Sequence, residues 1–277
     1  MSDIAEKVLL AITKSIENDQ MVLPTLPEVA LQVRDAAEDE NADIPMLCRA
    51  IQNDTALSAR IIKVTNNPLM RTNQTITDLR TAVSRLGIKY TSNLAMGLAM
   101  EQMFQATNDT IDALLRDNWQ RSTDIAGICH VLCRHYTKLA PDQATLAGLI
   151  HRIGALPLLT FAENHSALQK PELLRALVEK LSPRLGTLIL KHWDFPDELQ
   201  VVPEHCLDFT RQIDHADYAD LVTVAMLATA DQHGTPYGDI DLQHVTAFKR
   251  LAINPDADIL ADEDLGEEME AAMAYLD

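Results

Sequence analysis

The sequence predicts an all-α protein, a compact bundle of many helices with no β-sheet of consequence. Three observations support this fold class. Apolar residues recur at spacings of three and four along most of the 277 residues, the alternation typical of strands is nearly absent, and helix-capping residues precede several apolar runs. Because 47% of the residues are hydrophobic and 23% are charged, the chain can bury a substantial core beneath a charged surface.

Short helical patterns fill the first third of the chain. Ile4, Val8, Ile12 and Ile16 form one apolar stripe, which predicts a helix within residues 1–20. Asparagine, aspartate, serine and threonine favour the first position of a helix, and glycine favours the position after its end. On this basis the expected starts are Thr25 (with Glu28 completing a capping box), Asp43, Asp54 and Thr77, and the expected stop is Gly87.

The rest of the chain continues the helical pattern. Residues 111–132 predict one long helix or two abutting helices, and residues 145–156 form a buried apolar segment. Ser182 and Pro183 predict a cap with a proline in the first turn, and Pro196 should halt that helix. Further helices are expected over residues 199–207, 221–230 and 242–251.

No linker rich in glycine, serine or proline divides the chain, and no internal repeat is apparent. We therefore expect one helical body, in which residues 21–215 form the main domain and residues 216–253 are its closing helices. A boundary near residues 67–77 or near residue 215 stays open.

Charge and composition indicate which partners and which cellular compartment are expected for this protein. A formal net charge of −18 argues against a nucleic-acid partner, since phosphate binding needs a basic face. No apolar run approaches the length of a membrane span, and the N-terminal residues do not resemble a signal peptide. The four cysteines have no framework spacing, which favours reduced thiols. We expect a cytoplasmic protein without a membrane partner.

The C-terminal segment, residues 254–277, holds nine acidic residues and no lysine or arginine, and so supplies half of the net charge. An acidic segment of this kind is typically solvated. However, Leu265, Met269, Met273 and Leu276 form an apolar helical stripe. We expect a helix docked on its own chain or on a neighbouring copy, with a frayed tail as the alternative.

Two groups of residues could form a binding site, but packing in the core is the simpler interpretation of each. Cys129, His130, Cys133 and His135 lie close in sequence, but a continuous helix does not converge them as zinc requires, so buried thiols are expected. The stretch "KHWDFP" suggests an aromatic cage or, more simply, aromatic residues that close a helix onto the core. No nucleotide-binding loop or nucleophile elbow is present.

A charged pair interrupts the apolar segment "TLAGLIHRIGALPLLTF", where His151 is followed by Arg152. Burying an unpaired cation costs several kcal/mol, about 3 or more, so this pair needs a partner or a role. A histidine and a carboxylate on a helix hold divalent metal in many phosphohydrolases, where the metal activates a water. A guanidinium has no lone pair to donate to a metal. Arg152 occupies the position of that carboxylate.

Six segments in order resemble the HDOD domain, the HD-related output domain of bacterial signalling proteins. They are "LPTLPEVALQV", "LCRAIQNDTALSARIIKVTNNPLM", "ITDLRTAVSRLGIKYTSNLAMGLAM", "NWQRSTDIAG", "ATLAGLIHRIGALPLL" and "SPRLGTLILKHWDFPDEL". The resemblance covers roughly residues 21–208. It implies an all-helical fold related to the HD phosphohydrolases, with residues 21–215 as the HDOD domain.

HD phosphohydrolases bind metal with a histidine, then a His–Asp pair, then a final aspartate. The resemblance places these ligands at Arg121, at His151 and Arg152, and at Met226. Only His151 is a possible ligand, so these are vestigial positions, and we expect no metal and no cofactor. Arg121 and Arg152 then either fill the old cavity beside acids such as Glu163 or bind an anion.

The resemblance thus implies a non-catalytic bacterial regulatory protein that binds a signalling partner of unknown identity, and a homo-oligomer is possible. Two alternatives stay open. One is a metal-dependent phosphohydrolase of the HD superfamily, and the other is a sensor of an anion or nucleotide.

Overall fold

The computed structural model is helical throughout, and the predicted all-α class is confirmed. It describes residues 2–17, 23–70, 75–230, 237, 240–256, 260 and 265–276. No strand occurs within these ranges.

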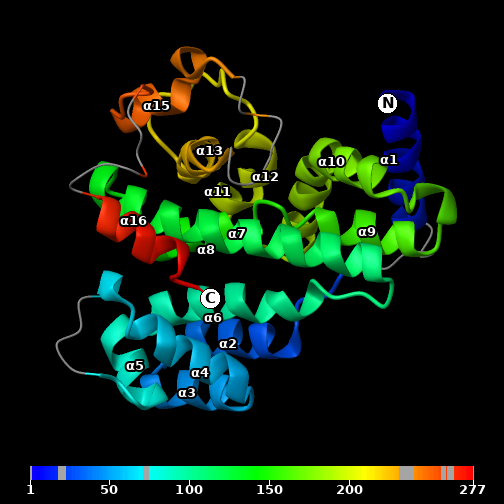
Figure 1. Ribbon diagram of the computed structural model, residues 1–277. Coiled ribbons are helices and arrows are strands. Elements are labelled where there is room, and N and C mark those ends of the chain that lie inside the picture. The colour runs from blue at the N-terminus through cyan, green and yellow to red at the C-terminus, as the bar shows by residue number, and fades with distance from the viewer. Residues whose placement is uncertain are drawn as a thin grey trace.

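Three layers of helices are stacked on one another (Figure 1). The middle layer holds α7 (Asp109–Tyr136), α8 (Pro141–Ile150) and α9 (Ala155–Glu163). One outer layer consists of α2 (Glu28–Glu38), α3 (Ile44–Gln52), α4 (Thr55–Thr65), α5 (Leu79–Leu86) and α6 (Ile88–Ala99). The other consists of α10 (Pro171–His192), α11 (Asp197–Gln200), α12 (Val202–His205), α13 (Tyr218–Ala228) and α15 (Thr246–Leu251). The N-terminal helix α1 (Ser2–Glu17) packs at one end, against α9 and α10.

The expected helix starts are confirmed at two of four positions. Asp43 accepts from Met46 N at 2.7 Å, and Asp54 accepts from Leu57 N at 2.9 Å. The capping box at Thr25 is wrong, because α2 begins only after Pro27. A residue that precedes proline disfavours helical backbone, so Leu26 cannot enter the helix.

The start at Thr77 is also wrong by one residue. Asp78 caps α5 instead and accepts from Thr81 N at 2.8 Å. The stop at Gly87 is confirmed, because α5 ends at Leu86. Gly87 has a φ of 84°, a backbone conformation that is strained for a residue with a Cβ. No loop follows Gly87, because α6 begins at the next residue. No helix is predicted from residues 88–99. Eight of these twelve residues are buried, so the sequence shows no narrow amphipathic stripe there.

Of the two alternatives for residues 111–132, the single long helix is confirmed, since residues 109–136 form one continuous helix. Two later elements differ from the expectation. The apolar segment around His151 divides into α8 and α9, and His151–Gly154 form the turn between them. Ser182 and Pro183 do not begin a helix, because both lie inside α10. Trp193 and Phe195 are buried at the end of α10, as the simpler interpretation of that stretch predicts.

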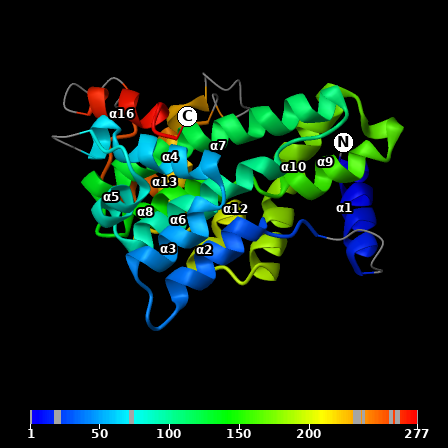
Figure 2. The ribbon, with the colours of Figure 1, turned by 90° about the horizontal axis from the view of Figure 1, so that it is seen from below.

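The C-terminal helix α16 (Gly266–Met273) docks along α7, and the docked-helix prediction is confirmed on the same chain (Figures 1 and 2). A Cβ on Gly127 of α7 would lie 1.9 Å from Ala272 O, so the two backbones are in direct contact. The register is not quite the expected one, since Met273 is only partly buried. The buried residues of this segment are Leu265, Met269, Ala272, Tyr275 and Leu276.

The expectation that no apolar run has the length of a membrane span is wrong, since among the described residues the stretch Pro141–Glu163 has that length and composition. This stretch is the central part of the fold, and 89% of its most apolar window is buried by the rest of the protein.

Candidate functional site

Three of the four positions that the resemblance singles out, His151, Arg152 and Met226, line one small cavity, and the charge of the fourth, Arg121, acts on Glu179 of the same cavity. Arg121 lies on α7, His151 and Arg152 lie in the turn after α8, and Met226 lies on α13. The turn approaches α10 closely at Gly154, where a Cβ would lie 2.0 Å from Ser182 O. Ser182 Oγ also donates to Arg152 O at 3.3 Å. The turn is therefore fixed against α10.

Arg152 is buried, with 8% of its surface exposed, and each side of its guanidinium has a partner. Its Nε donates to Asn118 Oδ1 at 2.7 Å. Its Nη2 donates to Glu179 Oε1 at 2.6 Å, and its Nη1 donates to Glu179 Oε2 at 3.4 Å. A bidentate contact of this kind is among the stronger polar interactions in proteins. Each of the three guanidinium nitrogens of Arg152 thus donates to an acceptor on α7 or α10.

Glu179 is the acid that balances Arg152. Burial raises the pKa of this carboxyl, but the charge and hydrogen bonds of Arg152 outweigh that effect and lower the pKa below its usual value. The Tyr237 hydroxyl donates to Glu179 Oε2 at 3.1 Å and acts in the same direction, as does the charge of Arg121. Glu179 is therefore ionised at neutral pH.

Arg121 faces the same region and has a second acid. Its Nη2 lies 3.0 Å from Asp117 Oδ2, one turn earlier on α7, and its side chain is 15% exposed. The suggestion that Glu163 neutralises these arginines is wrong. Glu163 Oε1 instead accepts from the backbone of Thr107 and Asn108 before α7, so it tethers the end of α9 to that loop.

His151 is buried and held by the backbone. Its Nδ1 lies 2.6 Å from Gly148 O, and because a carbonyl can only accept, Nδ1 carries the proton. A histidine that donates from Nδ1 to a carbonyl has the tautomer that many metal-ligating histidines adopt. The contact with Gly148 O therefore fixes His151 in that tautomer.

The cavity itself is almost filled by side chains. His151, Arg152, Glu179 and Met226 line it, and its volume of about 20 Å³ suffices for roughly one water molecule. Cys206 also lines it, and burial raises the pKa of this thiol to about 12. Cys206 is thus a neutral thiol and offers neither a thiolate nucleophile nor a soft anionic ligand. Within the described ranges, no three histidine, cysteine, aspartate or glutamate residues are grouped to hold a metal ion.

The cysteine–histidine cluster of α7 is accounted for by packing. Cys129 and Cys133 are buried free thiols. His130 turns away from them and contacts the Tyr90 hydroxyl and Thr145 Oγ1, each at 3.2 Å from Nδ1. These contacts attach α7 to α6 and α8, which is a structural role.

Three residues of this centre were missed by the analysis of the sequence. Asn118 precedes Arg121 by three positions and so shares a face of α7, which is a signal that could have found it. Glu179 and Tyr237 lie in other segments, and no local pattern connects either residue to Arg152.

Comparisons with known proteins agree with this architecture. The family model of the HDOD domain matches residues 23–206, and the chain belongs to this family. A crystal structure from Shewanella amazonensis SB2B, of a protein named as a candidate metal-dependent phosphohydrolase, is 30% identical with a TM-score of 0.88, and the match covers 100% of both chains. An HDOD domain protein of unknown function from Geobacter sulfurreducens is 16% identical with a TM-score of 0.69, over 98% of this chain and 99% of that one.

A curated relative from Treponema pallidum (strain Nichols), an uncharacterized protein, is 21% identical over 248 residues. The match covers 82% of this chain but only 46% of that protein. The chain therefore spans about half the length of this relative.

Proposed function

We propose that this chain is a non-catalytic signalling protein that acts by binding a protein partner through its HDOD domain. The observation that carries the proposal is the position of Arg152, whose guanidinium fills the place of a metal-binding carboxylate and is held there by Asn118 and Glu179. A cation fixed by two neighbouring helices cannot withdraw from an incoming metal without breaking three hydrogen bonds. Family membership supports the signalling role.

Charge balance supports the same conclusion. Arg121 and Arg152 are each paired with one acid, Asp117 and Glu179, so this set of four residues offers a divalent cation no net negative charge. A metal centre for phosphate chemistry also needs open coordination positions for water and substrate. A cavity that accommodates about one water has no room for both.

Hydrolysis is the rival function, and the name of the 30% identical Shewanella protein favours it. The test is elemental analysis of the purified protein, followed by assays on phosphomonoesters and cyclic nucleotides with added Mg²⁺ or Mn²⁺. We expect less than stoichiometric metal and no turnover. The matched control is the triple variant Arg121→His, Arg152→Asp, Met226→Asp, which restores the ligand types and should bind metal more tightly than the unaltered protein.

A finding of about one metal ion per chain, together with turnover that His151→Ala abolishes, would overturn the proposal.

Binding of a protein partner needs a measurement of its own. The protein should elute from cell extract in a complex larger than the purified chain, and light scattering of the pure protein distinguishes a complex with another protein from self-association.

Anion sensing has one observation in its favour. The buried Nε of Arg121 has no hydrogen-bond partner among the described residues, so one donor of this centre is unused. Phosphate titration monitored by thermal melting tests this function. A stabilisation that Arg121→Met removes would support it, and no shift at millimolar phosphate would exclude it.

A further inference from the structure

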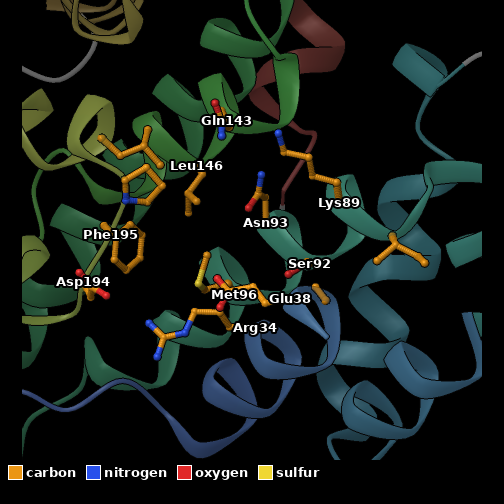
Figure 3. A pocket seen from close by; sticks show the side chains of 14 residues that line it. Arg34, Glu38, Lys89, Ser92, Asn93, Met96, Gln143, Leu146, Asp194 and Phe195 are labelled. Carbon is orange, nitrogen blue, oxygen red and sulfur yellow. The ribbon is translucent and has the colours of Figure 1, made fainter. Parts of the chain in front are cut away.

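A second, larger cavity lies between the first outer layer and the middle layer. It is lined by α2, α6, α8, α11 and the turn that follows α10 (Figure 3). It shares no lining residue with the cavity around Arg152. Its volume of about 410 Å³ falls within the range of small-molecule sites, roughly 300 to 1,000 Å³. This cavity has no part in the function proposed above.

The floor of this pocket is apolar. Met96, Leu146, Phe195 and Leu199 line it, and all four side chains are buried. A flat ring and a thioether suit the packing of an aromatic or otherwise apolar body. The pocket opens to solvent at its rim, where Lys89 and Pro196 are exposed.

Hydrogen-bond donors gather at one end of the pocket. Lys89 and Asn93 lie one turn apart on α6, and Gln143 lies on α8, which packs against α6. The Tyr218 hydroxyl donates to Gln143 Oε1 at 2.6 Å, so the carboxamide is oriented and its Nε2 is directed into the pocket (Figure 3). Asn93 Nδ2 donates to Asp142 Oδ2 at 2.7 Å, so that nearby carboxylate is already engaged.

The acids of the lining lie away from this end. Figure 3 places Asp194 and the Arg34 guanidinium far from Lys89 and Gln143, and Glu38 lies nearer Arg34 than Lys89. Arg34 Nη1 donates to Trp193 O at 2.9 Å. The Lys89 end of the pocket therefore presents a cation and an amide donor. The two lining acids, Glu38 and Asp194, lie at the other end, with Arg34.

The wall formed by the turn after α10 is held in place before any ligand arrives. Trp193 Nε1 donates to Pro24 O at 2.7 Å, and Phe195 N donates to Leu190 O at 3.1 Å. Gln200 Nε2 donates to Phe195 O at 2.5 Å. A preformed wall reduces the ordering cost of binding, which favours affinity for a small ligand.

We propose that this pocket binds a small amphipathic anion, and that the protein is a ligand-responsive regulator. The apolar body of the ligand packs on Phe195 and Met96, and its carboxylate, sulfonate or phosphate group meets Lys89 Nζ and Gln143 Nε2. Such a ligand contacts α2 and α6 on one side and α8 and the turn after α10 on the other. Binding therefore couples the outer layer to the middle layer.

Two fluorescent probes that differ only in the anionic group test the proposal. They are 8-anilinonaphthalene-1-sulfonate and its neutral counterpart N-phenyl-1-naphthylamine. We expect saturable binding of the sulfonate at one site per chain. Lys89→Met should weaken it by about five- to tenfold, as the loss of one ordinary hydrogen bond does, because Lys89 is exposed to solvent. It should change the affinity of the neutral probe by less than about twofold. Lys249→Met, an exposed lysine of α15 outside the pocket, is the matched control.

Ala37→Trp at the rim of the pocket should reduce the binding of both probes by filling the space. If circular dichroism shows that this variant does not fold, the comparison of Lys89→Met with Lys249→Met decides alone. The proposal is overturned by sulfonate binding that does not saturate, by equal effects of the two lysine variants, or by an equal loss of both probes in Lys89→Met.

Discussion

Arg152 Nη2 donates to Glu179 Oε1 at 2.6 Å across the boundary between the α8–α9 turn and α10. This contact explains why a cation can stand in the most apolar part of the sequence. Glu179 supplies the charge, Asn118 supplies a further acceptor, and Tyr237 supports the carboxylate from a third segment. Arg152, which the resemblance matches to a metal-ligand position of HD phosphohydrolases, joins the middle layer to α10.

Removal of Arg152 tests the strength of this connection. Arg152→Ala should lower the free energy of unfolding by about 3 to 5 kcal/mol, because Glu179 would be left largely buried without its partner. Urea denaturation measures the change. The control is Arg116→Ala. The side chain of Arg116 is 64% exposed and pairs with Asp112, and this surface pair should contribute about 1 kcal/mol or less. A loss below about 0.5 kcal/mol for Arg152→Ala would show that the side chain is in effect solvated.

Much of the fold was predictable because helix signals are local. Asp43, Asp54 and Gly87 act within four residues of their own position, and each behaves as expected. Pro183 shows where this local logic fails. A proline within a helix costs about 3 kcal/mol, so a serine followed by proline normally marks a start. In α10 the apolar residues on both sides of Pro183 are buried, and this tertiary packing keeps the helix continuous.

The candidate site was predictable only in part, for a different reason. The resemblance identifies positions along the chain, and the structure brings Arg152 and Met226 to one cavity. The partners of those positions depend on which distant helices pack there. Glu179 is 27 residues from Arg152, and the suggestion of Glu163 fails because α9 carries that acid to the loop before α7. The pocket beside Lys89 draws on four separate segments, so no local pattern reveals it.

A backbone constraint at Ala252 should be relieved by glycine. Ala252 ends α15 with a φ of 56°, in the left-handed region that disfavours residues with a Cβ, and its side chain is exposed. Ala252→Gly should therefore raise the free energy of unfolding by about 0.5 to 1 kcal/mol. Ala113→Gly, at an exposed position inside α7, should lower it by about 1 kcal/mol. A destabilisation by both variants, measured in urea, would contradict the expectation.

Acid should weaken the fold through His130. Burial, with a smaller effect from Arg134, lowers the pKa of His130 to about 4, whereas the pKa in the unfolded chain is about 6.5. The folded state therefore favours the neutral ring, and its contribution is complete above about pH 6.5. As the pH falls from about 6.5 to about 4, the unfolded chain takes up a proton that the folded chain does not, and up to about 3 kcal/mol is lost.

His130→Asn cannot titrate and should flatten the dependence of stability on pH within this window. Urea denaturation of both proteins between pH 7 and pH 4.5 measures the two slopes. Equal slopes would mean that His130 becomes protonated in the folded protein as readily as in the unfolded chain.

The contacts of His130 link this pH dependence to the C-terminal segment. The ring centroids of His130 and Tyr275 lie 5.3 Å apart, and the hydroxyls of Tyr90 and Tyr275 are hydrogen-bonded. Glu268 on α16 also contacts His135 at 2.9 Å and lies 3.8 Å from Arg134, so this acid is paired rather than solvated. Glu268 thus attaches α16 to α7, and Tyr275 attaches the residues after α16 to α6 and α7.

Release of α16 is the sharpest test of how the acidic segment is attached. Met269 is fully buried against the body of the protein, so Met269→Asp combined with Met273→Asp should undock the helix. Amide exchange over residues 265–276 should then rise toward that of a disordered peptide, while exchange in α7 should rise much less. Gly127→Ala should act in the same direction from the α7 side, because its Cβ would displace Ala272. The control is Glu267→Gln with Glu270→Gln, two exposed positions that should leave the protection unchanged. If these amides are already unprotected in the unaltered protein, α16 does not dock stably in solution.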